Sequence, residues 1–196
     1  MTVNLIKENT DEALMIAYKE GSISAFELLY ARHKAPLYRY FLRQIHSVES
    51  AQDLYQECWA RIIKSSGNYA VSAKWTTWAY RIAHNLCIDH FRGAKSHESY
   101  DESEPQEQNG SDSVVAQSGS TPEKAHQQSR LAEQLRYCIQ RLPADQREVF
   151  LLNQDTDMNL KMLAEVVGAT YESVKTKLRY AKAKLQACLR IKQGVA

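Results

Sequence analysis

The sequence predicts an all-α protein: two small helical domains joined by a flexible linker, the C-terminal one with a helix-turn-helix. Three observations support this fold class. Apolar residues recur at helical spacing on both sides of a polar central stretch. The 196 residues include only seven Gly and four Pro, so few positions interrupt a helix. Alternating apolar and polar residues, which would indicate strands, do not extend over a useful length.

The N-terminal half shows four helical segments in succession. Ser24 and Glu27 form a capping-box pattern ahead of an apolar run, and a second run covers residues 37–42. A third pattern covers residues 50–64, and a fourth covers residues 75–92 after the Gly67-Asn68 break. These segments predict a helical domain over residues 1–93.

The middle of the chain predicts a linker over residues 94–125. It is rich in Ser, Glu and Gln, and it lacks any sustained apolar period. Such a segment buries too little surface to offset the entropy of ordering it. Beyond it, Thr121, Pro122 and Glu123 indicate a helix start, and Pro143 interrupts the helical pattern again. The second helical domain is therefore expected over residues 126–196.

Charge is distributed unevenly along the chain. The net charge is +2, but residues 94–125 sum to −5 and residues 126–196 to +5. Residues 171–196 hold seven basic side chains and one acidic side chain. A basic helical end behind an acidic connector favours a nucleic-acid partner for the C-terminal domain.

Targeting signals and cysteine pairs are not evident. Residues 1–13 lack the apolar core of a secretion signal, and no apolar run approaches the ~18 residues of a membrane span. We therefore expect a cytoplasmic protein without direct membrane insertion. Its cysteines are far apart and form no CxxC pair, so we expect them to be small core residues rather than a metal or redox site. These are Cys58, Cys87, Cys138 and Cys188.

A helix-turn-helix is the strongest local motif. Ala164 is small enough for a close helix crossing, Gly168 tolerates a positive φ in the turn, and Val174 anchors the second helix. Thr170 is placed to cap that helix. Further core positions are Leu160, Leu163, Val167, Leu178 and Leu185. The exposed face would meet base edges and phosphates in the major groove, and a solvated basic helix is the alternative. The candidate DNA-binding residues are Tyr171, Glu172, Ser173, Lys175, Lys177 and Arg179.

The N-terminal domain carries two further candidate faces. Asp53, Gln56 and Glu57 share one side of a helix, which is either an ordinary solvated surface or a docking face for a basic partner helix. The next helix combines aromatic and basic side chains that suit unpaired bases and phosphates. A core position is the preferred interpretation for Trp78, on the apolar side, whereas for Trp75, at the helix entrance, both interpretations stay open. Its candidate residues are Trp75, Trp78, Arg81, Asn85, Asp89 and Arg92.

In this order, these segments resemble the extracytoplasmic-function (ECF) type of sigma factor. The resemblance covers roughly residues 10–93 and 126–190, and the runs DLYQE and VKTKLRYAKAKL are its most specific parts. It implies that Asp53, Gln56 and Glu57 bind a coiled coil of the largest subunit of core RNA polymerase. It implies that the segment at 75–92 melts and reads the minus-ten promoter element. It also implies that the C-terminal domain binds the minus-thirty-five element and the polymerase flap, and that an anti-sigma protein regulates the chain.

The sequence departs from that family pattern in two places. Asp155-Thr156-Asp157-Met158 replaces a glycine-containing turn ahead of the helix-turn-helix, which adds negative charge near DNA. Tyr171 and Glu172 stand where smaller residues are common, so the recognised promoter sequence is expected to be unusual.

Two other functions fit parts of the sequence. A polymerase-independent regulator would explain the helix-turn-helix but not the N-terminal faces. A sigma-like decoy that binds an anti-sigma protein would not need the basic C-terminal helix. An enzyme fits least, because no catalytic constellation or phosphate-binding loop is present, and we expect no catalytic residue, metal or cofactor.

Overall fold

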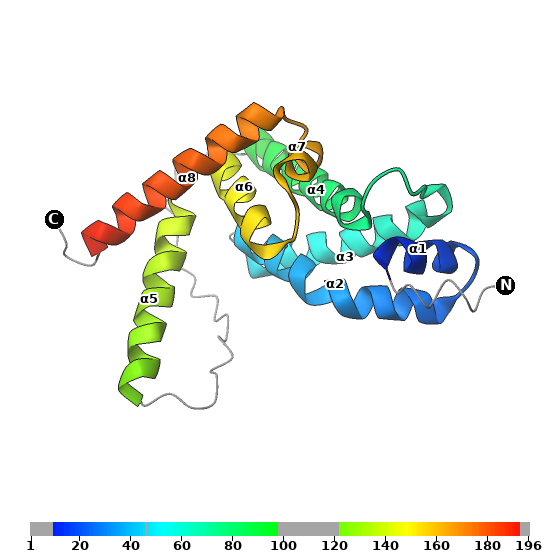
Figure 1. The fold of residues 1–196 in the computed structure, drawn as a ribbon, viewed down its shortest axis with the longest axis horizontal. Helices are drawn as coiled ribbons and strands as arrows, with labels where there is room; N and C mark the ends of the chain where they lie inside the picture. The colour runs from blue at the N-terminus through cyan, green and yellow to red at the C-terminus, as the bar shows by residue number, and fades with distance from the viewer. Residues whose placement is uncertain (1–9, 46, 98–121, 193–196) are drawn as a thin grey trace.

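The structure is a computed structural model that describes residues 10–45, 47–97 and 122–192, and all regular elements in these ranges are helices (Figure 1). The prediction of an all-α fold is confirmed. The N-terminal module consists of α1 (Asp11–Lys19), α2 (Ile23–Gln44), α3 (Val48–Ser65), the short 3₁₀ helix η2 (Ser66–Asn68) and α4 (Trp75–His97). The C-terminal module consists of α5 (Pro122–Gln140), α6 (Ala144–Asp155), α7 (Leu160–Val166) and α8 (Tyr171–Lys192).

The start of α2 differs from the sequence prediction. Ser22, not Ser24, is the N-cap, and its hydroxyl accepts a hydrogen bond from the backbone N–H of Ala25 at 3.4 Å. Ser22 has the extended backbone that a cap requires, whereas Ser24 already lies inside the helix. The helix then continues through Pro36, so the two predicted runs form one element. Leu29 and Leu37, both fully buried, fix the two halves to the same core.

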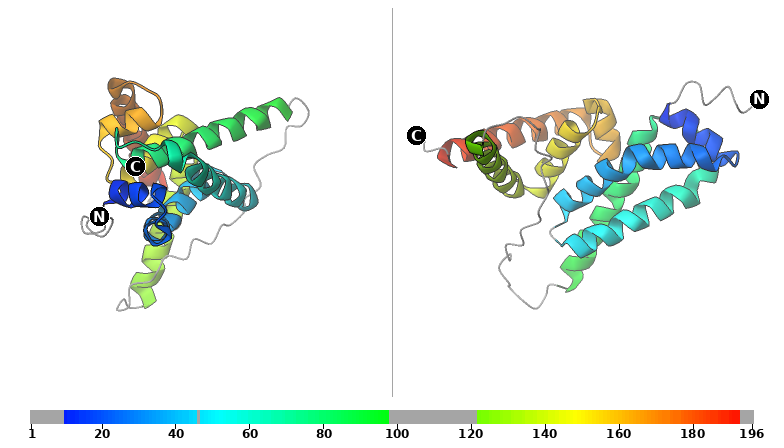
Figure 2. Two further views of the ribbon diagram at one scale, coloured as in Figure 1. Left: turned by 90° about the vertical axis from the view of Figure 1, so that its right-hand side faces the viewer. Right: turned by 90° about the horizontal axis from the view of Figure 1, so that it is seen from below.

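The four helices of the N-terminal module enclose an apolar core. Helices α2 and α3 run side by side, α4 packs against both, and α1 packs against α2 and α4 (Figures 1 and 2). Met15, Phe41, Ile62 and Tyr80, one from each helix, are at most 2% exposed. This packing determines which sides of α3 and α4 stay exposed to solvent and can bind another molecule.

The start of α4 depends on α1. The backbone N–H of Trp75, the first residue of α4, donates to Oε1 of Glu12 at 2.8 Å. A carboxylate at a helix N-terminus satisfies a free backbone donor and interacts favourably with the helix dipole. Because this cap comes from a different helix, local sequence reasoning around residue 75 does not identify it.

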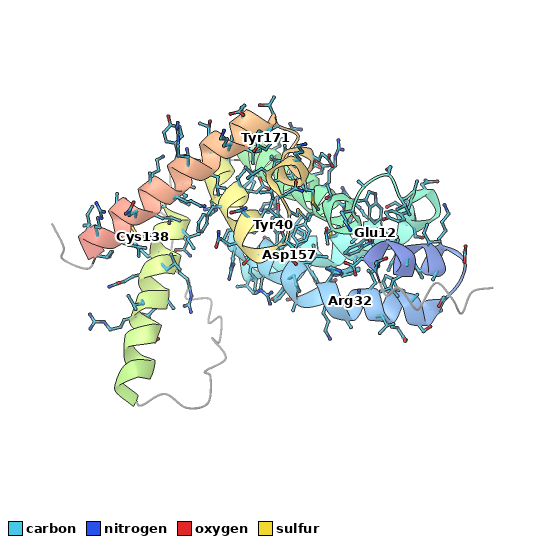
Figure 3. All side chains as sticks on the ribbon, viewed as in Figure 1. Glu12, Arg32, Tyr40, Cys138, Asp157 and Tyr171 are labelled. Carbon is cyan, nitrogen blue, oxygen red and sulfur yellow. A yellow bond between two sulfur atoms is a disulfide. The ribbon has the colours of Figure 1, made fainter. Side chains whose placement is uncertain are left out.

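A disulfide joins the two outer helices of the C-terminal module. Helix α5 packs against α8, and Cys138 and Cys188 are bonded, with 5.9 Å between their Cα atoms (Figure 3). The prediction that these two cysteines are core thiols is therefore wrong. Their positions are 50 residues apart, and only the crossing of α5 and α8 brings them together. The prediction is confirmed for Cys58 and Cys87, which are buried and free.

The predicted linker lies partly within the described helices. Helix α4 extends to His97, and α5 begins at Pro122, where the sequence predicted a start. Residues 98–121 lie outside the described residues.

The two modules share one apolar cluster. Helix α6 packs against α2, and α7 packs against α4 (Figure 2). Val149 and Leu152 of α6 and Leu163 of α7 belong to the same buried cluster as the N-terminal core. A smaller, separate cluster joins α5 to the second half of α8 and contains Leu185, which therefore does not belong to the core predicted for the helix-turn-helix.

Candidate polymerase and nucleic-acid interfaces

One side of α3 is acidic and exposed. Asp53, Gln56 and Glu57 all face solvent, while Ala51, Cys58 and Ile62 on the other side are fully buried. Residue spacing alone predicted this division. Glu57 is paired with Arg61 one turn later, with 2.8 Å between Oε1 and Nε. The face therefore offers two carboxylates and an amide, one carboxylate already oriented by a basic neighbour.

A hollow next to this face adds aromatic side chains that the sequence did not point to. It lies between α2 and α3 and has a volume of about 490 Å³. Tyr55 contributes to its wall, and burial, followed by a hydrogen bond to Tyr30, raises the pKa of its hydroxyl. Gln56 reaches both the hollow and the acidic face, so the two form one continuous surface. The lining residues are Tyr30, Lys34, Ala35, Tyr38, Gln52, Tyr55 and Gln56.

Helix α4 presents a polar stripe to solvent. Arg81, Asn85, Asp89 and Arg92 are all exposed, at the spacing of successive helical turns. Between them, Ala83 and Leu86 face the core. The structure thus brings together on one surface four of the six residues predicted for this segment.

The two tryptophans predicted for this segment are not part of the exposed stripe, because both pack against other aromatic side chains. Trp75 is fully buried, with its ring 4.4 Å from that of His33 and 6.4 Å from that of Trp59, so in this structure it has no free face for a base. Trp78 is half-buried and packs against Tyr69 at 5.1 Å. Core packing therefore explains Trp75, for which the sequence left both interpretations open. Trp78, for which a core position was preferred, is only partly buried and keeps part of its surface accessible.

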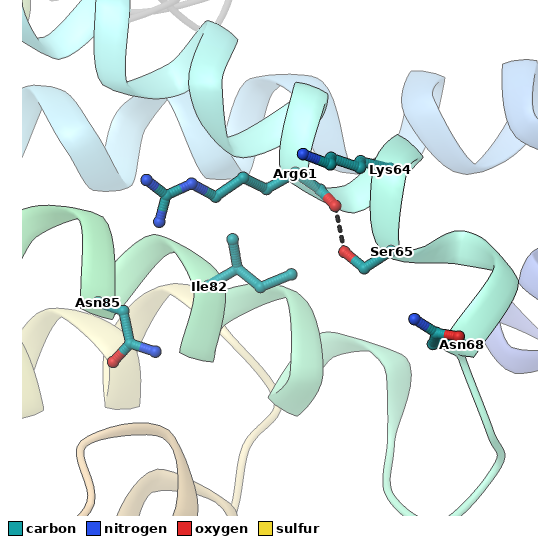
Figure 4. A pocket seen from close by; sticks show the side chains of 6 residues that line it. All are labelled: Arg61, Lys64, Ser65, Asn68, Ile82 and Asn85. Carbon is teal, nitrogen blue, oxygen red and sulfur yellow. Dashed lines mark hydrogen bonds between the residues drawn. The ribbon is translucent and has the colours of Figure 1, made fainter.

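A second hollow lies between the end of α3 and α4 (Figure 4). Its volume is about 380 Å³. Arg61 and Lys64 bring positive charge, Ile82 forms an apolar wall, and Asn85 brings an amide from the α4 stripe. The hydroxyl of Ser65 donates to the backbone carbonyl of Arg61 and helps to hold the end of the helix. The sequence did not predict Arg61 and Lys64 as part of this candidate site, because they belong to α3, the helix before the aromatic segment.

The helix-turn-helix forms as the spacing predicted. Ala164 and Val174 are buried, and Gly168 has a φ of 61° in the turn. The hydroxyl of Thr170 accepts from the N–H of Ser173 at 3.2 Å and caps α8. On α7, the side chain of Asn159 accepts from two backbone N–H groups at 3.0 Å. Both helices of the motif therefore begin at a side-chain cap.

The backbone conformation of the turn can be tested at Gly168. A Cβ there would meet no neighbouring atom, so Gly168→Ala changes the conformational preference alone. We expect a loss of about 1–2 kcal/mol in the free energy of unfolding, because a left-handed residue costs that much with a Cβ. Gly67→Ala is the matched control, since it also has open space and lacks a positive φ. Equal denaturation midpoints for the two variants would contradict this explanation.

The N-terminal half of α8 carries the candidate recognition residues. Tyr171, which is 42% exposed, begins the helix (Figure 3), and Lys175 and Arg179 follow on its exposed side. Two lysines have acidic neighbours: Lys175 lies 3.7 Å from Glu172, and Lys177 lies 3.3 Å from Asp145 of α6. The half-buried Ser173 completes the predicted set. The structure gathers all six residues on one helix.

The acidic turn before α7 is tied to the rest of the molecule. Asp155 accepts two hydrogen bonds from Nη1 of Arg43 in α2, at 2.6 and 2.8 Å, which offsets its charge. The Thr156 hydroxyl donates to the carbonyl of Leu152 at 2.6 Å, and Met158 is buried. Of the two added carboxylates, only Asp157 is exposed. The departure from the family pattern therefore contributes to packing.

Known proteins match both modules. Residues 29–97 match Sigma-70 region 2, and residues 132–185 match Sigma-70 region 4. The ECF RNA polymerase sigma factor SigW of Bacillus subtilis is 28% identical over 174 residues, which cover 88% of this chain and 92% of SigW. This chain belongs to the ECF family of sigma factors. The RNA polymerase sigma-H factor of Pseudomonas aeruginosa is 25% identical over 94% of this chain and 96% of its own length.

Solved structures agree with the fold of this ECF sigma factor. CnrH, solved in complex with the cytosolic domain of CnrY, superposes with a TM-score of 0.64 at 20% identity, over 92% of this chain and 97% of CnrH. The sigma factor RpoE of Bartonella quintana, solved with the anti-sigma factor NepR, gives a TM-score of 0.65 at 18% identity, over 86% and 99%. Within the described ranges, the sigma factor has no helix suited to crossing a membrane and no group of side chains suited to a metal.

Proposed function

We propose that this sigma factor binds core RNA polymerase through α3 and directs initiation through two DNA-binding faces, one on α4 and one on α8. The observation that carries the proposal is that the three faces are exposed on one chain, in the order of the family. The proposed division is residues 1–93 for polymerase docking and the minus-ten element, 94–125 as connector, and 126–196 for the minus-thirty-five element. The protein would work in the cytoplasm, where its polymerase partner is, and not as an enzyme.

Polymerase docking is assigned to Asp53, Gln56 and Glu57. The exposed carboxylates suit a basic helix, here the coiled coil of the largest subunit, and the tyrosine-lined hollow beside Gln56 suits its apolar side chains. The polymerase flap would contact the C-terminal module. An anti-sigma protein, as bound to the RpoE relative, is the expected inhibitor.

The minus-ten role is assigned to α4 and the hollow beside it. Arg81 and Arg92 are placed to hold phosphates, and Asn85 and Asp89 to contact base edges. An unpaired base would enter the hollow between Arg61 and Ile82, where positive charge and an apolar wall meet. Trp78 would add stacking surface from its exposed part. Trp75 would contribute by holding the start of α4 in place, since its ring is enclosed.

The minus-thirty-five role is assigned to the first turns of α8. Lys175 and Arg179 would contact phosphates or guanine edges, with Lys177 on the backbone. Tyr171, Glu172 and Ser173, at the N-terminal end of the helix, would face base edges. Polymerase tethers both modules to one promoter, so each module alone is expected to bind duplex DNA weakly.

Variants that each reduce the recognition of one promoter element test this assignment. Polymerase carrying the protein is incubated with a pool of genomic fragments, and the bound fragments are sequenced. We expect two enriched sequence blocks at a fixed spacing. The pair Lys175→Ala and Arg179→Ala should weaken only the upstream block, and Arg81→Ala with Asn85→Ala only the downstream block. Each base-edge interaction that a substitution removes should reduce enrichment by about 5- to 150-fold. Arg39→Ala, an exposed basic residue of α2, is the control.

Two outcomes would overturn the assignment. Enrichment that neither pair of substitutions changes would mean that other residues read the DNA. Equal enrichment without polymerase would indicate a polymerase-independent helix-turn-helix regulator.

A further inference from the structure

Helix α1 contacts both ends of the segment that joins η2 to α4. At one end, Nζ of Lys19 donates a hydrogen bond to the backbone carbonyl of Tyr69 at 3.2 Å. At the other end, Oε1 of Glu12 accepts a hydrogen bond from the N–H of Trp75 at 2.8 Å (Figure 3). Because Glu12 and Lys19 are seven residues apart, they lie on one face of α1, about 10 Å apart along its axis. One short helix therefore holds the loop 69–75 at both ends.

The middle of this loop is exposed to solvent, although its ends are buried. Tyr69 and Trp75 are at most 3% exposed, whereas Val71 is 62% exposed. The whole of 70–72 and Lys74 are also exposed. Fixed ends with an exposed middle are typical of loops that present binding residues on a rigid scaffold.

The loop begins at the wall of the hollow between α3 and α4. Asn68, the residue before Tyr69, lines that hollow (Figure 4). The ring of Tyr69 packs against Trp78 at 5.1 Å, and Trp78 is the residue whose exposed part is proposed to stack on a base. The position of the loop therefore influences both the wall of the hollow and the stacking surface beside it.

We infer that Glu12 and Lys19 are positioning residues for reading the minus-ten element, because together they fix the loop 69–75 beside the hollow that would take an unpaired base. The inference deepens the proposed minus-ten function and rests on it. Helix α1 precedes residues 29–97, which match Sigma-70 region 2, and the three proposed faces lie on other helices. A loop that is already fixed loses less conformational entropy when DNA binds, so promoter opening is favoured.

Amide hydrogen exchange in the free protein tests the two α1 contacts. Glu12→Ala should raise the exchange rate of the N–H of Trp75 at least about 10-fold, as expected for the loss of a hydrogen bond to a charged group. Glu12→Gln keeps an acceptor oxygen and should retain most of the protection. Lys19→Met keeps the aliphatic chain but removes the donor, so it should raise exchange at the start of the loop.

Promoter opening tests the consequence of these contacts. Polymerase carrying each variant is mixed with a promoter recovered from the enriched genomic fragments, and unpaired thymines are detected with permanganate. Templates that differ at single minus-ten positions give the base preference. Glu12→Ala combined with Lys19→Met should slow opening at least about 10-fold and weaken the base preference at one position, with unchanged affinity for core polymerase. Glu12→Gln alone should keep nearly wild-type opening.

Asp11→Ala is the matched control within α1. Asp11 pairs with Arg32 and His33 of α2, so its loss loosens the attachment of α1 without removing either contact with the loop. This variant should keep the wild-type base preference. An equal loss of preference in Asp11→Ala and in the combined variant would overturn the inference, because general loosening of the module would then explain both.

The outcomes are distinct for the positioning role and for the proposed function. Unchanged hydrogen exchange in Glu12→Ala and Lys19→Met would overturn the positioning role. Faster exchange with unchanged opening and unchanged base preference would also overturn it, and the proposed function would stand. If polymerase carrying the wild-type protein opens no promoter, the proposed minus-ten function fails together with the positioning role, even where exchange confirms the contacts.

Discussion

Replacing Asp53, Gln56 and Glu57 together by Ala is expected to weaken binding to core RNA polymerase at least about 30-fold, since truncating one side of a buried charged contact typically costs 2–5 kcal/mol. The three side chains are exposed and make no contribution to the core of α3, so the variant should fold normally. The measurement is the affinity of labelled protein for purified core polymerase, at two salt concentrations.

Glu20→Ala is the matched control for this loss, because Glu20 is an exposed acid at the end of α1. The wild-type affinity should also fall with salt, because salt screens the attraction between the acidic face and its basic partner. Wild-type affinity in the triple variant would show that polymerase docks elsewhere on the chain.

Reduction of the Cys138–Cys188 disulfide is expected to destabilise the C-terminal module by about 4 kcal/mol, the chain-entropy value for a separation of 50 residues. The apolar cluster of α5 with α8 is small, because within the described range it contains four buried residues, one of which is Cys138 itself. The measurement is chemical denaturation with and without dithiothreitol.

The Cys138→Ser and Cys188→Ser double variant is the internal control, because added reductant should not change its unfolding further. Thiol titration of the unreduced, unfolded protein should detect two free thiols, from Cys58 and Cys87. Four thiols would contradict the bond. Thiols in the cytoplasm, where the protein is proposed to work, are generally kept reduced. The bond would then form only under oxidising conditions, and the stability of α5 would depend on them.

The helices and their exposed faces could be predicted from the sequence because their determinants are local. Period 3.6 separates Asp53 from Ala51 and Cys58, and the spacing of Ala164 and Gly168 reflects the steric needs of a sharp turn. Such signals depend on neighbours within a few residues. The same holds for the start of α5 at Pro122.

The features that sequence reasoning missed all depend on contacts between distant segments. The enclosure of Trp75 follows from His33 and Trp59 on other helices, and the disulfide follows from the crossing of α5 and α8. Glu148 looks like an ordinary polar position in its own helix. Its partners are Tyr40 of α2 and His84 of α4, and only tertiary packing brings them beside α6, because periodicity does not decide which polar groups are buried.

The central claim is that this chain makes core polymerase initiate at specific promoters. Run-off transcription tests it most directly, with purified core polymerase, a pool of genomic promoter fragments and reactions with and without the protein. We predict new, discrete transcripts that appear only with the protein and disappear in the Asp53, Gln56 and Glu57 triple Ala variant. Tight binding to core polymerase without any specific transcript would contradict the claim and would indicate a sigma-like decoy.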